Sequence, residues 1–266
     1  MKGKYVILLC FLVNFTACEE VIELDLNETE PLLVIEAEVR NIIDGSYVRL
    51  SQSKNFYDHT DFLTIDEAIV TIVELDGATY NLTEVQPGYY KNPDLIGIAG
   101  KTYLLTVETN GQKYTATSTM PSVVPIDSLR IDFNESNAFS DEGYQVYCHF
   151  SDPASEQNFY KWRIYENQES VDGIFAWDDE LFNGSSNASY PFFRERFESG
   201  DTITVEMFGV DAANYEYLLG LEAIYNSGGP GGGSAAPGNP TTNLSGDALG
   251  YFGAFVYDVE TRVIAD

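Results

Sequence analysis

The sequence predicts an all-β fold of two β-sandwich-like domains in tandem, the second with one helix and long loops. The first observation is that apolar and polar residues alternate with period two in many segments, as they do in half-buried strands. The second is that Asp-Gly and Asn-Gly turns separate such segments, because these residues tolerate the positive φ angles of tight hairpins. The third is that apolar residues have helical spacing near residues 211–225.

Residues 1–17 have the pattern of a signal peptide and are excluded from the fold. Two lysines precede the apolar run Tyr5–Val13, which is too short to span a bilayer. The leader ends in Thr16-Ala17-Cys18, and small residues directly before a cysteine resemble the lipobox of bacterial lipoproteins. This pattern predicts that Cys18 carries the lipid anchor and becomes the first residue of the mature protein. The alternative is an ordinary secretory signal cleaved nearby, with Cys18 unmodified.

The segment 31–122 is predicted to form the first sandwich, of an immunoglobulin- or transthyretin-like kind. It follows an acidic stretch, residues 18–30, which we expect to act as a tether to the membrane. Alternation begins in Leu32–Arg40, which predicts a half-buried strand. Asp-Gly at residues 76–77 and Asn-Gly at residues 110–111 are each flanked by strand-like runs, so each predicts a hairpin.

Residues 123–266 are predicted to form the second, β-rich domain. Several segments have strand patterns bounded by turn residues: Ser128–Phe133, Tyr144–Ser151, Asn158–Glu166 and Thr202–Phe208. Asp211 is a suitable N-cap for a helix near 211–225. The Gly- and Pro-rich residues 226–243 are predicted to form a loop, and residues 248–255 to return to the core as a strand.

The charge balance argues against nucleic acid as a partner. The chain has 42 Asp and Glu against 14 Lys and Arg, a formal net charge of -28, whereas phosphate backbones are bound by clustered Lys and Arg. The two histidines, His59 and His149, provide almost no material for a multi-histidine metal site. Cleavage before Cys18 leaves Cys148 as the other thiol, so we expect no internal disulfide and a buried, inert Cys148 on the apolar face of a strand.

No catalytic residue, cofactor or metal ligand is predicted. The chain lacks the Gly-x-Ser-x-Gly motif of many serine hydrolases and the His-Glu-x-x-His motif of zinc proteases. Asp178–Glu180 offers oxygen ligands for Ca²⁺ without the spacing of a known loop, and a solvated acidic turn is the simpler interpretation. The Gly-rich run 228–233 lacks the Gly-Lys-Ser/Thr ending of a phosphate-binding loop. Among 42 acidic residues a catalytic carboxylate pair is not excluded.

Aromatic residues crowd the stretch 167–199, which we predict to be a long connection. Aromatic rings stack on sugars and peptides and are enriched at interfaces, so part of this connection is predicted to contact a ligand or a partner. The candidate residues are Phe175, Trp177, Phe182, Tyr190, Phe192 and Phe193. The alternative is that these rings face the core.

Several short segments follow Cys18 in a characteristic order: Leu33–Glu36, Asp66–Val70, Gly88–Tyr90, Gly100–Leu105, Ile126–Leu129, Gly143–Val146 and Leu249–Phe252. This ordered series resembles the DUF4249 family of lipoproteins from Bacteroidota. The resemblance covers nearly the whole mature chain, and it rests on the order of the segments rather than on one specific motif.

The resemblance implies a protein of the outer membrane, lipid-anchored and facing outside, beside a TonB-dependent transporter. The family has no established catalytic residues that could be carried over to this chain. We therefore expect a non-catalytic binding or accessory module with a TonB-dependent outer-membrane receptor as its partner. Two alternatives stay open: a surface enzyme that degrades glycans or peptides with carboxylates, and a passive, adhesin-like structural lipoprotein.

Overall fold

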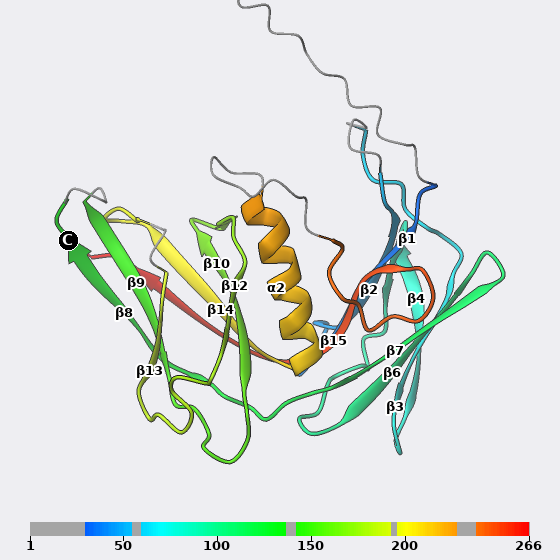
Figure 1. The fold of residues 1–266 in the computed structure, drawn as a ribbon, viewed down its shortest axis with the longest axis horizontal. Helices are drawn as coiled ribbons and strands as arrows, with labels where there is room; N and C mark the ends of the chain where they lie inside the picture. The colour runs from blue at the N-terminus through cyan, green and yellow to red at the C-terminus, as the bar shows by residue number, and fades with distance from the viewer. Residues whose placement is uncertain (1–29, 55–59, 137–141, 193–195, 228–237, 266) are drawn as a thin grey trace, which may run out of the picture. The chain divides into compact units, whose positions relative to one another are not determined.

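The computed structural model of this chain describes residues 30–54, 60–136, 142–192, 196–227 and 238–265 (Figure 1). The predicted leader 1–17, the lipidation candidate Cys18, nearly all of the tether 18–30 and most of the loop 226–243 lie outside these residues. Pro31–Asp266 forms one compact unit. Within the part of the chain that is described, no helix has both the length and the apolar character needed to cross a membrane.

Strands dominate the described residues, in two sheets with one helix, which confirms the predicted all-β fold. The large sheet runs in the order β11 (Glu169–Ser170), β10 (Phe159–Glu166), β14 (Thr202–Val210), β15 (Leu249–Val263), β1 (Leu33–Arg40), β2 (Tyr47–Gln52), β5 (Tyr89–Lys91), β4 (Thr79–Gln86), β3 (Ile69–Glu74), β6 (Thr102–Thr109) and β7 (Gln112–Thr119), with β12 (Phe175–Asp178) also beside β10. The small sheet has the order β13 (Ala188–Pro191), β9 (Gly143–Phe150) and β8 (Ile126–Asn134).

The last strand, β15, joins both halves of the chain in one sheet. Its first residues pair in parallel with β1, with Leu249 opposite Val34. Its later residues pair antiparallel with β14. β15 therefore pairs with a strand from each of the two predicted domains, with β1 from 31–122 and with β14 from 123–266.

The local turn and cap predictions are confirmed. β3 and β4 pair across the Asp-Gly turn, where φ is 63° at Asp76, and β6 and β7 pair across the Asn-Gly turn, where φ is 50° at Asn110. Both values lie in the left-handed region that tight hairpins require. Helix α2 (Ala212–Ser227) begins directly after Asp211, whose Oδ1 accepts a hydrogen bond from Asn214 N at 2.8 Å.

The aromatic stretch 167–199, predicted to be a long connection, runs between β10 and β14 and contains three short strands that were not predicted. β12 pairs with β10, β13 pairs with β9, and β11 forms a hairpin with β10. These strands are two to four residues long. An alternating pattern is recognised over about four to eight residues, so strands this short give little or no signal in the sequence.

Two large apolar clusters form most of the core. The first lies along β1, β2, β3, β6 and the first half of β15, and includes Ile35 and Leu105. The second lies between the small sheet and the strands β10 and β14, and includes Val146, Trp162 and Val205. The neighbouring strands β14 and β15 contribute a small third cluster of Phe208, Val210 and Phe255.

Cys148 of β9 is fully buried in the second cluster, as predicted. Burial raises the pKa of its thiol to about 12, so the reactive thiolate is scarce in the folded protein. In a form of the chain that begins at Glu19, Cys148 is the single cysteine. We expect Ellman's reagent to label no thiol of this form in the native state and one thiol after unfolding. Rapid labelling of the native protein would contradict the buried position of Cys148.

Candidate functional site

Three basic side chains converge on one buried carboxylate, Glu38 of β1. Arg40 donates to Glu38 Oε2 from Nε at 2.8 Å and from Nη2 at 2.5 Å. Arg163 of β10 donates from Nη2 to Glu38 Oε1 at 2.8 Å. Lys161, also of β10, places its Nζ 3.6 Å from the same oxygen. These four residues are called the Glu38 cluster below.

The strand geometry explains why these side chains share one face of the sheet. Each of the two strands contributes two residues that are two positions apart, and such residues project from the same face of a strand. β14 and β15 lie between β10 and β1 in the sheet. On β14, Phe208 is opposite Lys161, and on β15, Phe255 is opposite Arg40. Two aromatic rings therefore lie between the two pairs of charged residues.

These rings contact the basic groups directly. The Cζ atoms of Arg163 and Arg40 lie 5.0 and 5.2 Å from the centre of the Phe208 ring. The Nζ atom of Lys161 lies 3.8 Å from the centre of the Phe255 ring and 4.9 Å from that of Phe208. Cations at these distances are attracted by the negative face of an aromatic ring, which offsets part of the cost of removing them from water.

Gly253 leaves the space in which this arrangement fits. It is opposite Glu38 in the β1–β15 ladder. A Cβ atom at Gly253 would lie 1.9 Å from the ring of Phe255. The missing side chain therefore allows the Phe255 ring to lie back over the strand, close to Lys161.

The charges of the Glu38 cluster do not balance. Burial by itself raises the pKa of Glu38, but the three basic groups lower it by more, to about 2. Burial lowers the pKa of Lys161 to about 8, although Glu38 opposes this change. Three cations surround Glu38, and the carboxylate of Glu206 lies opposite Arg163 in the β10–β14 ladder, so a local excess of one positive charge remains. In a chain with a formal charge of -28, this excess is concentrated at one place.

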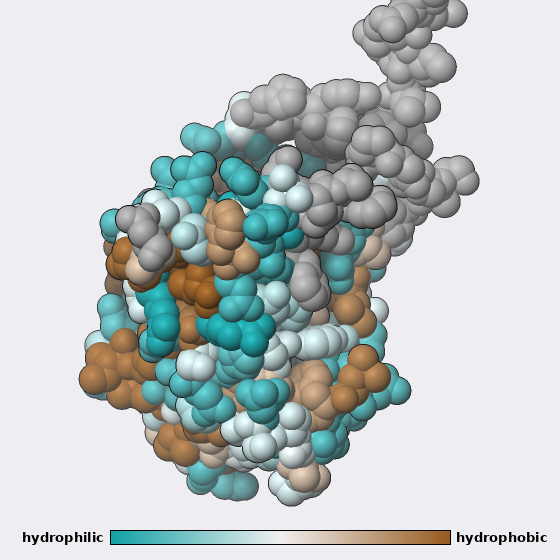
Figure 2. All heavy atoms as spheres, turned by 90° about the vertical axis from the view of Figure 1, so that its left-hand side faces the viewer, coloured by the Kyte–Doolittle hydropathy of each residue, from teal (hydrophilic) through white to brown (hydrophobic). Residues whose placement is uncertain are grey.

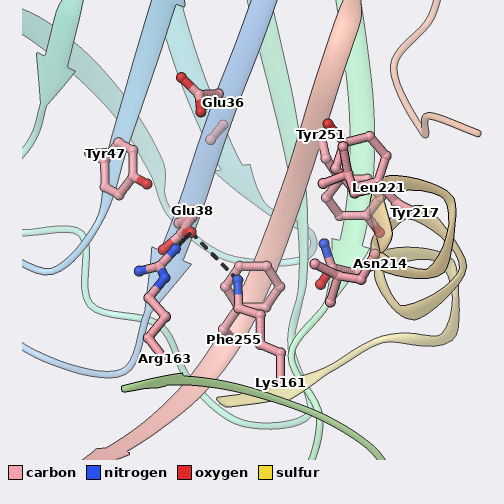
Figure 3. A pocket seen from close by; sticks show the side chains of 12 residues that line it. Glu36, Glu38, Tyr47, Lys161, Arg163, Asn214, Tyr217, Leu221, Tyr251 and Phe255 are labelled. Carbon is pink, nitrogen blue, oxygen red and sulfur yellow. Dashed lines mark hydrogen bonds and ion pairs between the residues drawn. The ribbon is translucent and has the colours of Figure 1, made fainter. Parts of the chain in front are cut away.

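A cavity of about 190 Å³ lies beside the Glu38 cluster (Figure 3). In this view Glu36 is at the upper end of the cavity and Lys161 at the lower end. The side chains of α2 and β15 supply a mainly apolar and aromatic wall. The lining residues are Glu36, Ala37, Glu38, Tyr47, Lys161, Arg163, Asn214, Tyr217, Leu218, Leu221, Tyr251 and Phe255.

Asn214 lines this cavity and carries a buried side-chain oxygen without a partner. The residue is 4% exposed, and its Oδ1 atom has no hydrogen-bond partner. Its position is fixed through the helix cap, because Asp211 Oδ1 accepts hydrogen bonds both from Asn214 N and from the hydroxyl of Tyr251, at 2.8 and 2.7 Å. A buried amide without a partner is costly, which makes it a candidate contact for a bound molecule.

The arrangement is suited to binding an anion. A general acid needs a raised carboxyl pKa, whereas the pKa of Glu38 is lowered. The other carboxylate of the cavity, Glu36, is half-exposed and lies 3.5 Å from Nη1 of Arg49. Among the described residues, no group of three or more His, Cys, Asp or Glu side chains is arranged to hold a metal ion.

The aromatic residues predicted as contacts lie mostly against the second core cluster. Phe192 is 1% exposed, and the side chains of four others are partly buried there: Phe175, Trp177, Phe182 and Tyr190. Phe193 lies outside the described residues. Figure 2 views the molecule from the side of the small sheet and shows separate hydrophobic areas among hydrophilic residues. A contact role for this group stays a prediction.

The acidic turn at Asp178–Glu180 differs from the expected solvated turn. Asp179 is 1% exposed, and its Oδ2 accepts a hydrogen bond from Asn158 N at 2.8 Å. The carboxylate therefore satisfies a buried backbone group at the start of β10. Sequence alone did not show this, because the partner lies in another strand.

Sequence reasoning missed the Glu38 cluster. The alternation in Leu32–Arg40 predicts a strand with one covered face, and charged residues usually lie on the opposite, solvated face. A signal was nevertheless present in β10, where Lys161 and Arg163 alternate with Tyr160 and Trp162. The chain has only 14 basic residues, and two of them occur here two positions apart, in a strand that is otherwise aromatic and apolar. This combination indicates that both faces of the strand are covered.

Comparisons with known proteins match most of the chain to one family profile. The profile described as "Domain of unknown function (DUF4249)" matches residues 19–261. No curated protein matches the chain. Solved structures with a match include a segment of two fibronectin type III domains from chicken tenascin, 12% identical, which covers 68% of this chain and 91% of that chain with a TM-score of 0.22. Another is the chicken interferon gamma receptor alpha chain, 10% identical, with coverages of 68% and 90% and a TM-score of 0.20. With TM-scores this low, neither likeness supports an argument about fold or function.

Proposed function

We propose, from the premise that this chain belongs to the DUF4249 family, that it is a non-catalytic binding module anchored by lipid in the outer membrane. It faces outward there and serves a TonB-dependent transporter as an accessory protein. The lipobox-like sequence that ends in Cys18 supports the anchor. The association with a transporter follows from the family resemblance.

The observation that carries the binding role is the cavity beside the Glu38 cluster. It combines buried cations, an unpaired amide and an apolar wall, as ligand sites do. The carboxylate enzyme is less well supported, because Glu38 is held in its ionised form. The passive structural protein is less well supported too, because unbalanced buried charges are costly to keep without a ligand.

The anchor and the partner are tested together by affinity purification from detergent-solubilised membranes. We expect the tagged wild-type chain to recover a TonB-dependent receptor from the outer-membrane fraction. Substitution of the lipidated residue, Cys18→Ala, is expected to remove the chain from this fraction and to abolish labelling with radioactive palmitate. Cys148→Ala is the matched control, because it removes a buried thiol that is not part of the leader sequence and should leave both results unchanged.

Two outcomes would count against the proposal. Palmitate labelling that persists in Cys18→Ala would show that Cys18 is not the lipidated residue. Failure to recover a receptor, together with normal transport in a deletion strain, would remove the accessory role.

A further inference from the structure

We propose that the cavity beside the Glu38 cluster binds a small α-hydroxy or α-amino acid with an apolar side chain. In this arrangement Lys161 and Arg163 hold the carboxylate of the ligand, Asn214 accepts a hydrogen bond from its hydroxyl or amino group, and the wall from α2 and β15 contacts its side chain. The inference deepens the binding role proposed above and rests on it, but it depends neither on lipidation nor on the transporter.

The excess positive charge determines the sign of the ligand. Glu38 compensates one of the three cations that surround it. Glu206, opposite Arg163 in the β10–β14 ladder, compensates a second one, and it also accepts hydrogen bonds from the hydroxyls of Tyr257 and Tyr165, at 2.9 and 3.3 Å. A carboxylate in this half-open cavity would offset the remaining charge.

Lys161 has donors available for this carboxylate. Its ammonium group can donate three hydrogen bonds. The nearest carboxylate oxygen, Glu38 Oε1, is 3.6 Å away and therefore beyond ordinary hydrogen-bond length. Lys161 Nζ also contacts the rings of Phe255 and Phe208, which offer no oxygen acceptor. The side chain is 10% exposed, so bulk water satisfies few of these donors.

Asn214 determines the second feature of the ligand. Its buried Oδ1 needs a donor, and a carboxylate has none. A hydroxyl or ammonium group next to the carboxylate supplies one when the amide of Asn214 turns towards the cavity. Glu36 lies at the other end of the cavity in Figure 3, and its carboxylate would repel the anionic group of the ligand. This group therefore fits the region around Lys161.

The size and the wall of the cavity determine the rest of the molecule. About 190 Å³ is below the ~300–1,000 Å³ of pockets for drug-sized ligands, so the occupant is a small molecule. The side chains of Leu218, Leu221 and Tyr251 offer it an apolar and aromatic surface. An aliphatic or aromatic side chain is complementary to this surface.

The test is titration calorimetry with a set of matched compounds. The protein is the chain that begins at Glu19, because Pro31–Asp266 is compact on its own and no membrane is needed. L-3-phenyllactate and L-phenylalanine carry the carboxylate, the donor and the ring, and they distinguish a hydroxyl from an amino donor. 3-Phenylpropanoate lacks the hydroxyl or amino group next to the carboxylate, and 3-phenylpropanamide lacks both this group and the negative charge. We expect one of the first two to bind, 3-phenylpropanoate to bind more weakly, and the amide to bind at least about tenfold more weakly still.

Two variants locate the binding. Lys161→Met and Asn214→Leu keep the size of each side chain and are each expected to weaken binding by about tenfold or more. Lys113→Met removes an exposed cation that pairs with Glu108 on neighbouring strands, and it should leave the affinity unchanged. Thermal unfolding of each variant checks that it is folded. No binding of phenyllactate or phenylalanine by the wild type, equal binding of the amide, or unchanged affinity in Lys161→Met would overturn the proposal while leaving the membrane experiments valid.

Discussion

Replacing Glu38 by glutamine is expected to lower the free energy of unfolding by about 3–5 kcal/mol. The change keeps the shape of the side chain but removes the one anion with which Arg40, Lys161 and Arg163 are paired. Because these groups are largely buried, water cannot replace the lost charge. Urea unfolding of Glu38→Gln and of the wild type at neutral pH measures the difference.

Glu36→Gln is the matched control for this experiment. It makes the same chemical change two residues earlier on β1, at a side chain that is 49% exposed. Exposed ion pairs such as that of Glu36 with Arg49 contribute less than about 1 kcal/mol. Similar, small losses in both variants would contradict the assignment of Glu38 as the central anion of a buried cluster.

The pH dependence of the free energy of unfolding, compared between the wild type and Glu38→Gln, tests the same assignment in a second way. The pKa of Glu38 is lowered from 4.5 to about 2 in the folded state, so its contribution to stability is fully present above pH 4.5. The contribution is lost as the pH falls through the folded pKa, because the proton then binds in both states. This change corresponds to about 3 kcal/mol. The stability difference between wild type and Glu38→Gln should therefore shrink as the pH is lowered from 4.5 towards 2.

Replacing Gly250 by alanine is expected to lower the free energy of unfolding by about 3 kcal/mol or more. Gly250 has a φ of 96° and lies opposite Ile35 in the β1–β15 ladder. A Cβ atom there would lie 2.1 Å from the carbonyl oxygen of Ile35, which is backbone and cannot move aside. The ladder would have to open where the last strand meets the first. Urea unfolding measures the loss.

Gly100→Ala separates the two causes of this loss. Gly100 has a φ of 80°, but a Cβ atom there would have no other atom within 4 Å. Alanine at Gly100 therefore carries only the cost of the left-handed conformation, roughly 1–2 kcal/mol. Equal losses in the two variants would show that the close approach to β1 does not constrain the β15 backbone.

The Glu38 cluster could be predicted from the sequence only in part. The spacing of Lys161 and Arg163 shows that they share a face of their strand. Their partner is 125 residues away from Arg163, and the two strands come into position only through β14 and β15. Local patterns determine which residues share a face, but they do not determine which distant strand supplies the opposite charge.

The elements that the sequence determined by itself are those with local causes. The hairpin turns follow from residues that accept positive φ, such as Asn110, and the start of α2 follows from the side chain of Asp211 bonding to its own helix. Tertiary structure alone decided the parallel pairing of β1 with β15 and the burial of Glu38. The physical reason is that these depend on the register between strands and on what covers each face, and neither is encoded within one stretch of the chain.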